Sequence, residues 1–296
     1  MPLESIRSLV QSDLKATDNF ILTELSSEIP LINQLVQYVL SCGGKRIRPL
    51  LVLLTARALN HQNQQHIDLA AAIELIHTAT LLHDDVVDSS TMRRGNKTAN
   101  NIWGNEASVL VGDFLYSRAF QLIVKLKNFE IMDIFASATN LIAEGEVLQL
   151  INCNDPDTTE EAYYSVIQRK TAKLFEVASQ IGTALCDYEH QQMVAMQRYG
   201  LAVGTAFQLI DDALDYSASA AEMGKNRGDD LAEGKPTLPL IHAMRHGTKA
   251  EAKLIRQAIK KGSTKDIDSI LTIIESTGAI EYTANAAKQQ IADATN

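Results

Sequence analysis

The stretch Leu81–Gly95, LLHDDVVDSSTMRRG, decides how the rest of the chain is interpreted. It places three carboxylates at the end of an apolar run with helical spacing: Asp84, Asp85 and Asp88. In a helix, Asp84 and Asp88 share one face, and Asp85 lies about 100° around the axis. Like charges four residues apart destabilise a bare helix, so this arrangement needs a compensating cation. Aspartate oxygens suit Mg²⁺, which usually binds one or two carboxylates together with phosphate oxygens.

Two arginines and a second copy of the pattern strengthen this interpretation. Arg93 and Arg94 follow the aspartates and suit an anion, most simply a phosphate. Taken alone, the first pattern also fits a solvated acidic end of a helix. The second copy is Phe207–Tyr216, FQLIDDALDY, which ends another apolar run with Asp211, Asp212 and Asp215. We expect the two aspartate groups to face each other across one cavity and to bind several Mg²⁺ ions around a diphosphate.

The composition limits the class of protein. The chain has 296 residues and 46% hydrophobic residues, enough for one large domain with a sizeable core. Its net charge of −9 argues against nucleic acid as a partner, because a nucleic-acid-binding protein needs a basic surface. The three cysteines are scattered and suit buried thiols in a reducing compartment. The N-terminus lacks a signal peptide, and no apolar run has the length of a membrane span, so we expect a soluble cytoplasmic protein.

Apolar residues recur with helical spacing along nearly the whole chain, and alternating strand patterns are missing. The helices are expected near residues 5–26, 31–41, 46–59, 66–88, 106–127, 129–151, 159–185, 190–217, 236–246, 249–261, 264–276 and 279–294. Glycine-rich or polar segments separate many of them. We therefore expect an all-α protein, with residues 1–296 forming a single large helical bundle around a central cavity.

Three further polar segments are candidates for substrate binding. Gly43–Pro49, GGKRIRP, brings three cations to a helix start, where a diphosphate would also meet the helix dipole. His77 lies two turns before Asp84 on the same expected helix. The cations Arg169 and Lys170 interrupt an apolar helix, and the charged loop 224–235 follows the second aspartate group, where it would serve as a lid. Each segment also has a simpler interpretation as a solvated turn or a core residue.

At this point the chain resembles the trans-isoprenyl diphosphate synthases. Five motifs occur in that family's order, between about Leu31 and Gly247: GGKRIRP, LLHDDVVDSSTMRRG, KTAKLF, FQLIDDALDY and GKNRGDDLAEGKPTLPL. The wording HTATLLHDDVVD, EGEVLQL and GTAFQLIDD is most similar to the bacterial octaprenyl diphosphate synthases. The resemblance implies an isoprenoid-synthase fold, a homodimer, and head-to-tail condensation of isopentenyl diphosphate onto an allylic diphosphate, most simply farnesyl diphosphate. It implies an octaprenyl product that supplies quinone side chains. This product would partition into the membrane, although the protein itself is expected to be soluble.

The resemblance also implies roles for individual residues. The ligands of about three Mg²⁺ ions per site, with Mn²⁺ as an alternative, are Asp84, Asp85, Asp88, Asp211, Asp212 and Asp215. The allylic diphosphate is held by Arg93, Lys170, Lys225 and Lys235. Isopentenyl diphosphate is held by Lys45, Arg48, His77 and Arg94. Thr171 and Gln208 lie near the reacting carbons.

The residues just before Asp84 predict a long product. Ala79 and Thr80 are small, whereas bulky aromatic residues at these positions stop chain growth early in the family. Further back along the helix, Leu75 to Ala70 lie about 14–21 Å from Asp84, a depth that suits a long polyprenyl chain. The closed end of this tunnel requires a bulky residue on a neighbouring helix, for which Phe120, Leu122 and Met132 are candidates.

Several alternatives remain open at this point. They are a shorter-chain farnesyl or geranylgeranyl synthase, a class I terpene cyclase, a non-catalytic subunit of a heteromeric synthase, and an acidic helical bundle that binds metal without catalysis. Small residues at 79 and 80 disfavour the farnesyl enzyme, and GGKRIRP disfavours the cyclase. Both aspartate groups are complete, which disfavours the non-catalytic subunit. Octaprenyl synthases usually continue through another C-terminal helix, so we expect this sequence to be shortened at Asn296, with full activity in question.

Overall fold

The computed structural model describes residues 2–217 and 227–295, which are mostly helical. The expected all-α fold is confirmed. Contacts within the chain divide it into two compact units. The first unit comprises Met1–Ala136 and Val177–Gln197, and the second comprises Ser137–Glu176 and Arg198–Asn296. The prediction of a single domain over residues 1–296 stays a prediction.

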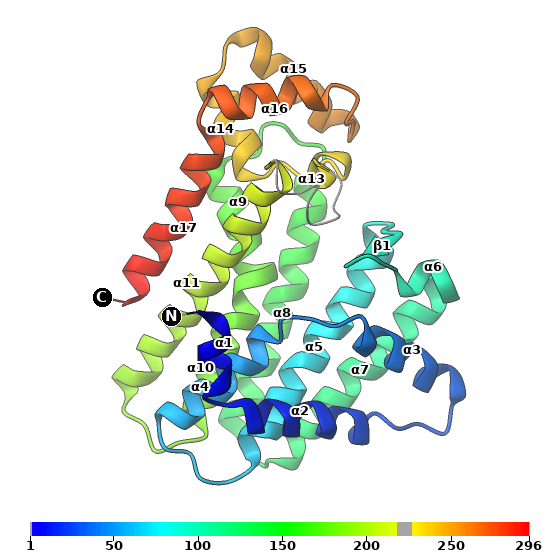
Figure 1. Ribbon diagram of the computed structural model, residues 1–296, viewed down its shortest axis with the longest axis vertical. Helices are drawn as coiled ribbons and strands as arrows, with labels where there is room; N and C mark the ends of the chain where they lie inside the picture. The colour runs from blue at the N-terminus through cyan, green and yellow to red at the C-terminus, as the bar shows by residue number, and fades with distance from the viewer. Residues whose placement is uncertain (1, 218–226, 296) are drawn as a thin grey trace. The chain divides into compact units, whose positions relative to one another are not determined.

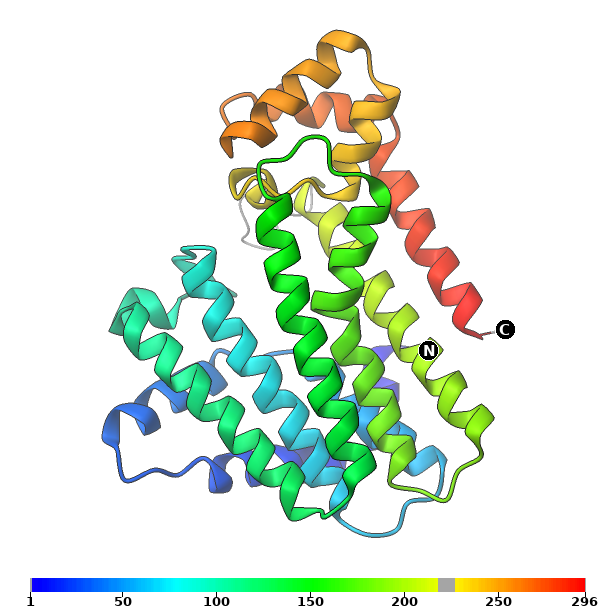
Figure 2. The same ribbon diagram turned by 180° about the vertical axis from the view of Figure 1, so that it is seen from behind.

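The first unit is built around one long buried helix, α5 (Gln65–Val87). The other helices that begin in this unit are α1 (Leu3–Ser8), α2 (Gln11–Glu24), α3 (Pro30–Ser41), α4 (Ile47–Ala58), α6 (Ala99–Trp103), α7 (Asn105–Lys125), α8 (Phe129–Asn152) and α11 (His190–Asp215). Helix α5 packs against α2, α4, α6 and α7, and its apolar side chains point in nearly all directions, as expected for a core helix. Figures 1 and 2 show α5 and α7 side by side. This packing fixes the end of α5, where the first aspartates lie.

Helix α7 is the one helix among residues 2–217 and 227–295 that is long and apolar enough to cross a bilayer by length and composition alone. Many core helices of soluble proteins have the same length and composition. Its buried side chains include Val111, Leu115 and Ala119, and the helix packs against α5. These contacts account for the apolar residues on its buried face.

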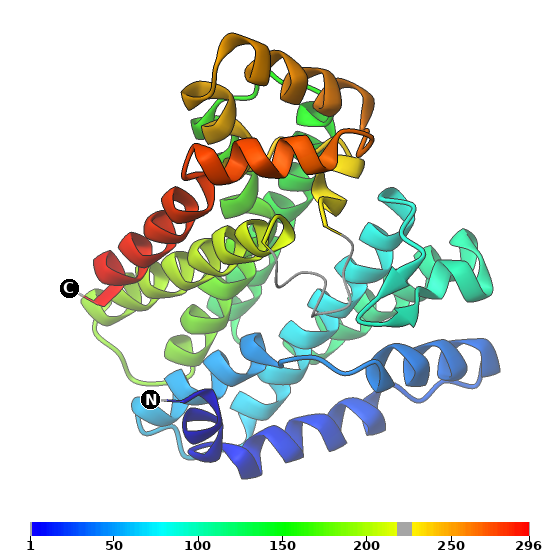
Figure 3. The same ribbon diagram turned by 45° about the horizontal axis from the view of Figure 1, so that its top comes forward.

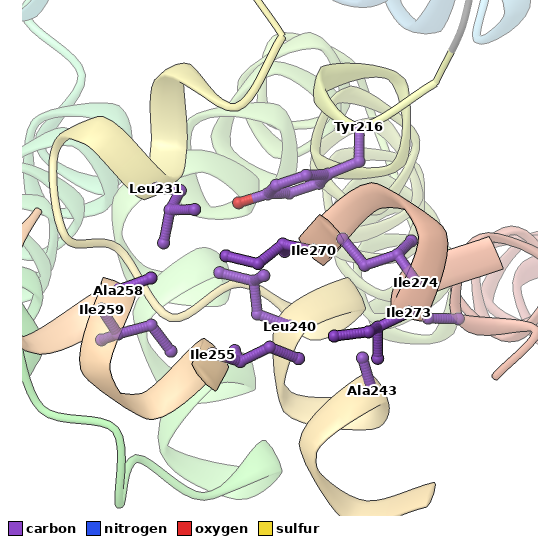
Figure 4. Close-up of a cluster of buried hydrophobic side chains, with 11 residues drawn as sticks. Tyr216, Leu231, Leu240, Ala243, Ile255, Ala258, Ile259, Ile270, Ile273 and Ile274 are labelled. Atoms are coloured by element: carbon purple, nitrogen blue, oxygen red, sulfur yellow. The ribbon is translucent and has the colours of Figure 1, made fainter. Parts of the chain in front are cut away.

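The second unit contains the shorter C-terminal helices. Those that begin in it are α9 (Glu160–Ile167), η1 (Gln168–Ala172), α10 (Lys173–Ala184), α13 (Asp229–Ala232), α14 (Leu238–His246), α15 (Lys249–Lys261), α16 (Ile267–Ser276) and α17 (Ala279–Thr295). Residues of α9, α11, α14 and α17 share one apolar cluster that includes Leu209 and Ala287. Figure 3 shows α17 lying along α11. A second cluster joins the end of α11 to α13–α16, and in Figure 4 Tyr216 lies over Ile270 and Leu240 within it.

Several local features differ from the helices expected from sequence, among them the short helix α13 (Asp229–Ala232) within the expected loop 224–235. The expected helix 5–26 is divided into α1 and α2 at Val10, whose side chain is buried and whose backbone leaves the helical region. The expected helix 159–185 contains a π-helical turn, η1. A short hairpin and helix α6 replace an expected loop between α5 and α7. The hairpin and the π-helical turn both carry candidate site residues.

Candidate active site

The first aspartate group lies at the C-terminal end of α5, which the structure ends at Val87 with Asp88 as its cap. Asp85 is buried, and the guanidinium Nε of Arg93 donates a 2.7 Å hydrogen bond to its Oδ1. Burial raises the pKa of Asp85, while Arg93 opposes this shift and the charges of Asp84 and Asp88 add to it. The aspartate group therefore gains from additional positive charge, as a divalent cation would provide.

A two-stranded hairpin holds both arginines of the first motif. Strand β1 (Met92–Arg93) pairs antiparallel with β2 (Asn96–Lys97), and Arg94 and Gly95 form the turn. Both turn residues have positive φ, +51° and +78°, as a type I′ hairpin turn requires. Arg93 contacts Asp85, while Arg94 donates to the carbonyl oxygen of Gly43. The glycine at 95 was the sequence signal for this turn.

The segment Gly43–Pro49 enters α4 through an unusual backbone conformation. Gly43 has φ +72°, and Arg46, the N-cap of α4, has φ +45°. A Cβ added to Gly44 would lie 2.7 Å from Nη1 of Arg94, so a side chain larger than hydrogen would displace that guanidinium. Lys45 is exposed, and its carbonyl oxygen accepts a 3.0 Å hydrogen bond from Arg7. The predicted helix start at this segment is confirmed, since α4 begins at Ile47.

A pocket in the first unit brings many of these residues together. Its acidic, basic and histidine lining residues are Arg46, Glu74, His77, Asp85, Arg93, Arg94 and Lys97. His77 Nε2 lies 3.2 Å from Nη1 of Arg48. Burial is the main cause of the low pKa of His77, and the neighbouring arginines lower it further, so His77 is neutral at physiological pH. Burial also lowers the pKa of Arg48 to about 10, so Arg48 stays charged at neutral pH. The pocket thus combines guanidinium groups with a neutral imidazole, which suits an anion.

The second aspartate group lies at the end of α11, in the second unit. Both oxygens of the buried Asp212 accept hydrogen bonds of 2.6 Å, Oδ2 from the hydroxyl of Tyr163 and Oδ1 from the side-chain amide of Gln208. Burial raises the pKa of Asp212 to about 7, and the charges of Asp211 and Asp215 add to the rise, although both hydrogen bonds oppose it. This group also needs extra positive charge at neutral pH.

The π-helical turn positions three predicted site residues of the second unit. Thr171, within η1, donates a 3.0 Å hydrogen bond to Oε1 of Gln208, which continues to Asp212. Lys170, also in η1, forms a 2.5 Å ion pair with Glu146 of α8. Arg169 pairs with Glu144 at 2.9 Å. Single π-helical turns occur often at functional sites, and this one brings Lys170 and Thr171 next to the α11 network.

Asp215, the last residue of α11, contacts the start of helix α13. Its carboxylate accepts backbone hydrogen bonds from Asp229 at 3.3 Å and Asp230 at 3.2 Å, so Asp215 also holds the start of α13. Burial, with the charges of Asp212 and Asp215, raises the pKa of Asp230 well above its usual value. Lys235 forms an ion pair with Glu233. Lys225, expected to bind the allylic diphosphate, lies outside the described residues, as does part of the expected lid 224–235.

The two product-length candidates differ in burial. Ala79 is fully buried within α5, whereas Thr80 is half-buried and donates a 2.9 Å hydrogen bond to the carbonyl oxygen of His77. A larger side chain at 79 would have to displace core neighbours, while one at 80 has more room.

The carboxylate oxygens of the two aspartate groups are suitable ligands for Mg²⁺, but the described residues do not form a complete coordination shell by themselves. Among residues 2–217 and 227–295, no three histidine, cysteine or acidic side chains are grouped closely enough to hold a metal ion. Mg²⁺ usually takes only one or two carboxylates and completes its octahedron with water and phosphate oxygens. The raised pKa values of Asp85 and Asp212 indicate that each group would bind added positive charge favourably. The residues therefore fit Mg²⁺ that arrives with a diphosphate.

Sequence reasoning missed several residues of these networks. Tyr163 and Glu74 were not among the predicted site residues, and Arg46 was counted only among the three cations of GGKRIRP. Each of the three contacts or lines the networks described above. Glu74 lies three residues before His77 and thus on the same face of α5, which was an available signal. Nothing in the local sequence placed Tyr163 next to Asp212, because the contact joins α9 to α11.

Comparisons with known proteins agree with these features. The family model for polyprenyl synthetase matches residues 29–276. The octaprenyl diphosphate synthase of Haemophilus influenzae is 52% identical over 291 residues, covering 98% of this chain and 88% of that protein. The enzyme of the same name from Escherichia coli is 51% identical, covering 98% and 90%. A crystal structure of a polyprenyl synthase from Caulobacter crescentus, complexed with calcium and isoprenyl diphosphate, matches with a TM-score of 0.95 and 41% identity, covering 99% of this chain and 90% of that one. The chain therefore belongs to the polyprenyl synthetase family.

Proposed function

We propose that this protein is a long-chain trans-polyprenyl diphosphate synthase that adds isopentenyl diphosphate units head-to-tail to an allylic diphosphate. Farnesyl diphosphate is the proposed primer, and octaprenyl diphosphate, for quinone side chains, is the proposed product. The observation that carries the proposal is the pocket of the first unit, where Asp85 and Arg93 adjoin an arginine- and histidine-lined anion site. The relatives from Haemophilus influenzae and Escherichia coli, which carry the name octaprenyl diphosphate synthase, support the length of the product.

We assign the allylic diphosphate to the two aspartate groups and their cations. Asp84, Asp85 and Asp88 of the first unit, with Asp211, Asp212 and Asp215 of the second, would hold about three Mg²⁺ ions per site, and Mn²⁺ is an alternative. When bound, Mg²⁺ would neutralise negative charge on the departing diphosphate. Arg93, Lys170 and Lys235 supply further positive charge, and Lys225 is assigned the same role from the sequence. The metal and the isoprenyl diphosphate named in the Caulobacter crescentus structure support this choice of ligands.

We assign isopentenyl diphosphate to Lys45, Arg48, His77 and Arg94. Arg48 and His77 contact each other at 3.2 Å, and Arg94 lines the same pocket as His77. A neutral His77 donates one hydrogen bond to the diphosphate without adding charge, while the guanidinium groups offer paired donors. These side chains would hold isopentenyl diphosphate by its diphosphate group and leave its double bond free to react.

The reaction then follows from charge and the exclusion of water. The allylic C–O bond breaks, and the arginine and lysine side chains stabilise the charge that develops on the leaving diphosphate. The double bond of isopentenyl diphosphate attacks the allylic carbon, a new C–C bond forms, and the released diphosphate takes up the proton that is lost. Thr171 and Gln208 are oriented by their mutual 3.0 Å hydrogen bond. Their proposed place is near the reacting carbons, where water must be excluded because it would compete for the allylic carbon.

We propose that the working protein is a cytoplasmic homodimer. On α7, Val109, Leu110 and Val124 are exposed apolar side chains, and Phe129 at the start of α8 is 85% exposed. Exposed apolar surface of this kind often marks a contact with another protein. Leu110→Glu is expected to shift the purified protein from dimer to monomer in light scattering, whereas Lys127→Glu, on the α7–α8 turn, should not. A wild-type protein that is monomeric at micromolar concentration would contradict this part of the proposal.

The decisive experiment incubates the purified chain with farnesyl diphosphate, isopentenyl diphosphate and Mg²⁺ and identifies the products by mass spectrometry. We expect an octaprenyl product from the wild type and a loss of at least about 10³-fold in rate for Asp84→Asn. Glu106→Gln, an exposed change on α7, is the matched control and should keep full activity. A geranylgeranyl product would indicate the shorter-chain alternative. No product from a folded chain would support the non-catalytic subunit.

A further inference from the structure

The pocket of the first unit contains a buried carboxylate that the reaction described above does not use. Glu74 lines the pocket from α5 and is only 5% exposed. The other acidic side chain that lines the pocket, Asp85, is already paired with Arg93. Glu74 instead accepts a hydrogen bond from Nη1 of Arg46. A carboxylate in this pocket would weaken the binding of a diphosphate, so its presence there needs an explanation.

The Glu74–Arg46 pair ties the segment before α4 to α5. Arg46 is the N-cap of α4 and has φ +45°, a conformation that non-glycine residues rarely adopt. Its guanidinium contacts Glu74 and also lies 3.4 Å from Asp18 of α2. The pair therefore holds the backbone that presents Lys45 and leads into Arg48.

The negative charge of Glu74 also acts on two other arginines, Arg48 and Arg94. Burial lowers the pKa values of Arg48 and Arg94, and the negative charge of Glu74 opposes both shifts. Glu74 thus stabilises the positive charge of both guanidinium groups while the pocket holds no anion. The same charge repels a diphosphate once it is bound, because charges in a buried site are weakly screened.

We propose that Glu74 is a positioning residue that limits how tightly this pocket holds a diphosphate, so that the diphosphate can leave after each condensation. The proposal rests on the assignment of this pocket to isopentenyl diphosphate. In each condensation the allylic C–O bond breaks, its diphosphate departs, a C–C bond forms and one proton is lost. The diphosphate that remains on the longer chain is the one that entered with isopentenyl diphosphate. A synthase that repeats the step must therefore move this group to the aspartate side before each new round.

Glu74→Gln tests the charge while keeping an oxygen that can accept the hydrogen bond from Arg46. The probe is inorganic diphosphate, titrated by calorimetry in the presence of a chelator, because without divalent cations the aspartate groups repel it. We expect the variant to bind diphosphate about ten-fold more tightly than the wild type. With farnesyl and isopentenyl diphosphates, we expect a lower KM for isopentenyl diphosphate, a lower kcat and shorter products.

Asp18→Asn is the matched control. Asp18 contacts the same guanidinium, but its side chain is 54% exposed, so solvent screens its charge. This variant should change diphosphate affinity less than about two-fold. Equal or weaker binding by a folded Glu74→Gln protein would overturn the proposal. No metal-free binding of diphosphate to the wild type, or binding unaffected by Arg94→Ala, would instead refute the assignment of the pocket.

A second pair of variants keeps the test valid if Glu74→Gln does not fold. Arg46→Met leaves the charge of Glu74 in place, whereas the double variant Arg46→Met/Glu74→Met replaces the ion pair by apolar side chains of similar length, a change that buried pairs often tolerate. We expect the double variant to bind diphosphate about ten-fold more tightly than Arg46→Met. Equal affinities would show that Glu74 acts only by holding the backbone, and would overturn the proposal.

Discussion

The hydroxyl of Tyr163 donates a 2.6 Å hydrogen bond to Oδ2 of Asp212, although the two residues lie 49 positions apart in the chain. Gln208 occupies the other carboxylate oxygen at the same distance and is itself bonded to Thr171. Asp212 is thus held in one rotamer, and its remaining lone pairs point in fixed directions. Such support around a metal-binding carboxylate commonly tunes metal affinity.

Tyr163→Phe should therefore weaken metal binding while leaving the fold intact. In the wild type the pKa of Asp212 is about 7, and the hydrogen bond from Tyr163 lowers it. Loss of this bond raises the pKa and so disfavours the charged form that binds Mg²⁺. We expect the Mg²⁺ concentration for half-maximal activity to rise about ten-fold. Tyr164→Phe, whose ring contacts that of Tyr163, is the control and should leave the Mg²⁺ dependence unchanged. An unchanged Mg²⁺ dependence in Tyr163→Phe would mean that Asp212 does not contact the metal.

Gly145→Ala should disturb the site through the π-helical turn. A Cβ at position 145 would lie 2.8 Å from the backbone nitrogen of Lys170 and from Cβ of Arg169, so α8 and η1 must separate. We expect a loss of about 1–3 kcal/mol in the free energy of unfolding and a higher KM for the allylic diphosphate. Glu144→Gln removes only the exposed partner of Arg169 and should change stability by less than about 1 kcal/mol. A Gly145→Ala protein with wild-type stability would show that the contact relaxes freely.

Bulky residues before Asp84 should shorten the product. Thr80 is half-buried, so Thr80→Phe should fold and obstruct the tunnel with its aromatic ring, whereas Ala79→Phe must also displace core side chains at a cost of about 1–3 kcal/mol. We expect both variants to give products several isoprene units shorter, measured by mass spectrometry. Thr80→Val, of similar volume, should keep the wild-type length. If both phenylalanine variants make full-length product, the tunnel does not follow α5.

The stability of the first unit should depend on pH through His66. This histidine is fully buried, lies 3.3 Å from Asp13 and faces Arg57 and His61. Burial lowers its pKa below 6.5, so the folded state favours the neutral ring. The resulting stability is fully present above pH 6.5 and is lost as the pH falls through the lowered pKa. Asp13 adds no change in this window, because its hydrogen bond with Arg57 keeps its pKa below 3.8.

Thermal melting between about pH 7.5 and about pH 5 would measure this effect. The melting temperature of the wild type should fall across the window, and that of His66→Gln should fall less. His246→Gln, an exposed change on α14, should keep the wild-type slope. Parallel curves for wild type and His66→Gln would assign the acid sensitivity to other groups.

Much of the fold was predictable because helices have a local signal. The spacing of apolar residues located most helices within a few residues. The helix expected from residue 159 begins at Glu160, with Thr159 as an N-cap that accepts a 3.1 Å hydrogen bond from Ala162. The π-helical turn was missed because it keeps the apolar character of a regular helix and differs only in hydrogen bonding. The hairpin at Met92–Lys97 was missed because two-residue strands are too short to show alternation.

In the candidate site, too, residues with a local sequence signal could be predicted, whereas contacts between separate helices could not. Aspartate groups and the cations of GGKRIRP stand out by composition and spacing, so their residues could be named from the sequence. The contacts of Tyr163 with Asp212 and of Lys170 with Glu146 join separate helices and could not. The tunnel residues, the roles of the individual cations and the meeting of the two aspartate groups stay predictions.

The hairpin turn at Arg94–Gly95 also sets a limit on sequence change. Neighbours in the chain, Arg93 and Arg94 reach different targets, a carboxylate of α5 and a carbonyl before α4, because the chain reverses between them. A turn with two left-handed residues accepts only one length. Inserting or deleting a single residue here would misalign the donors for the primer with those for the incoming unit, so homologous enzymes should vary around this turn by substitution and not by length.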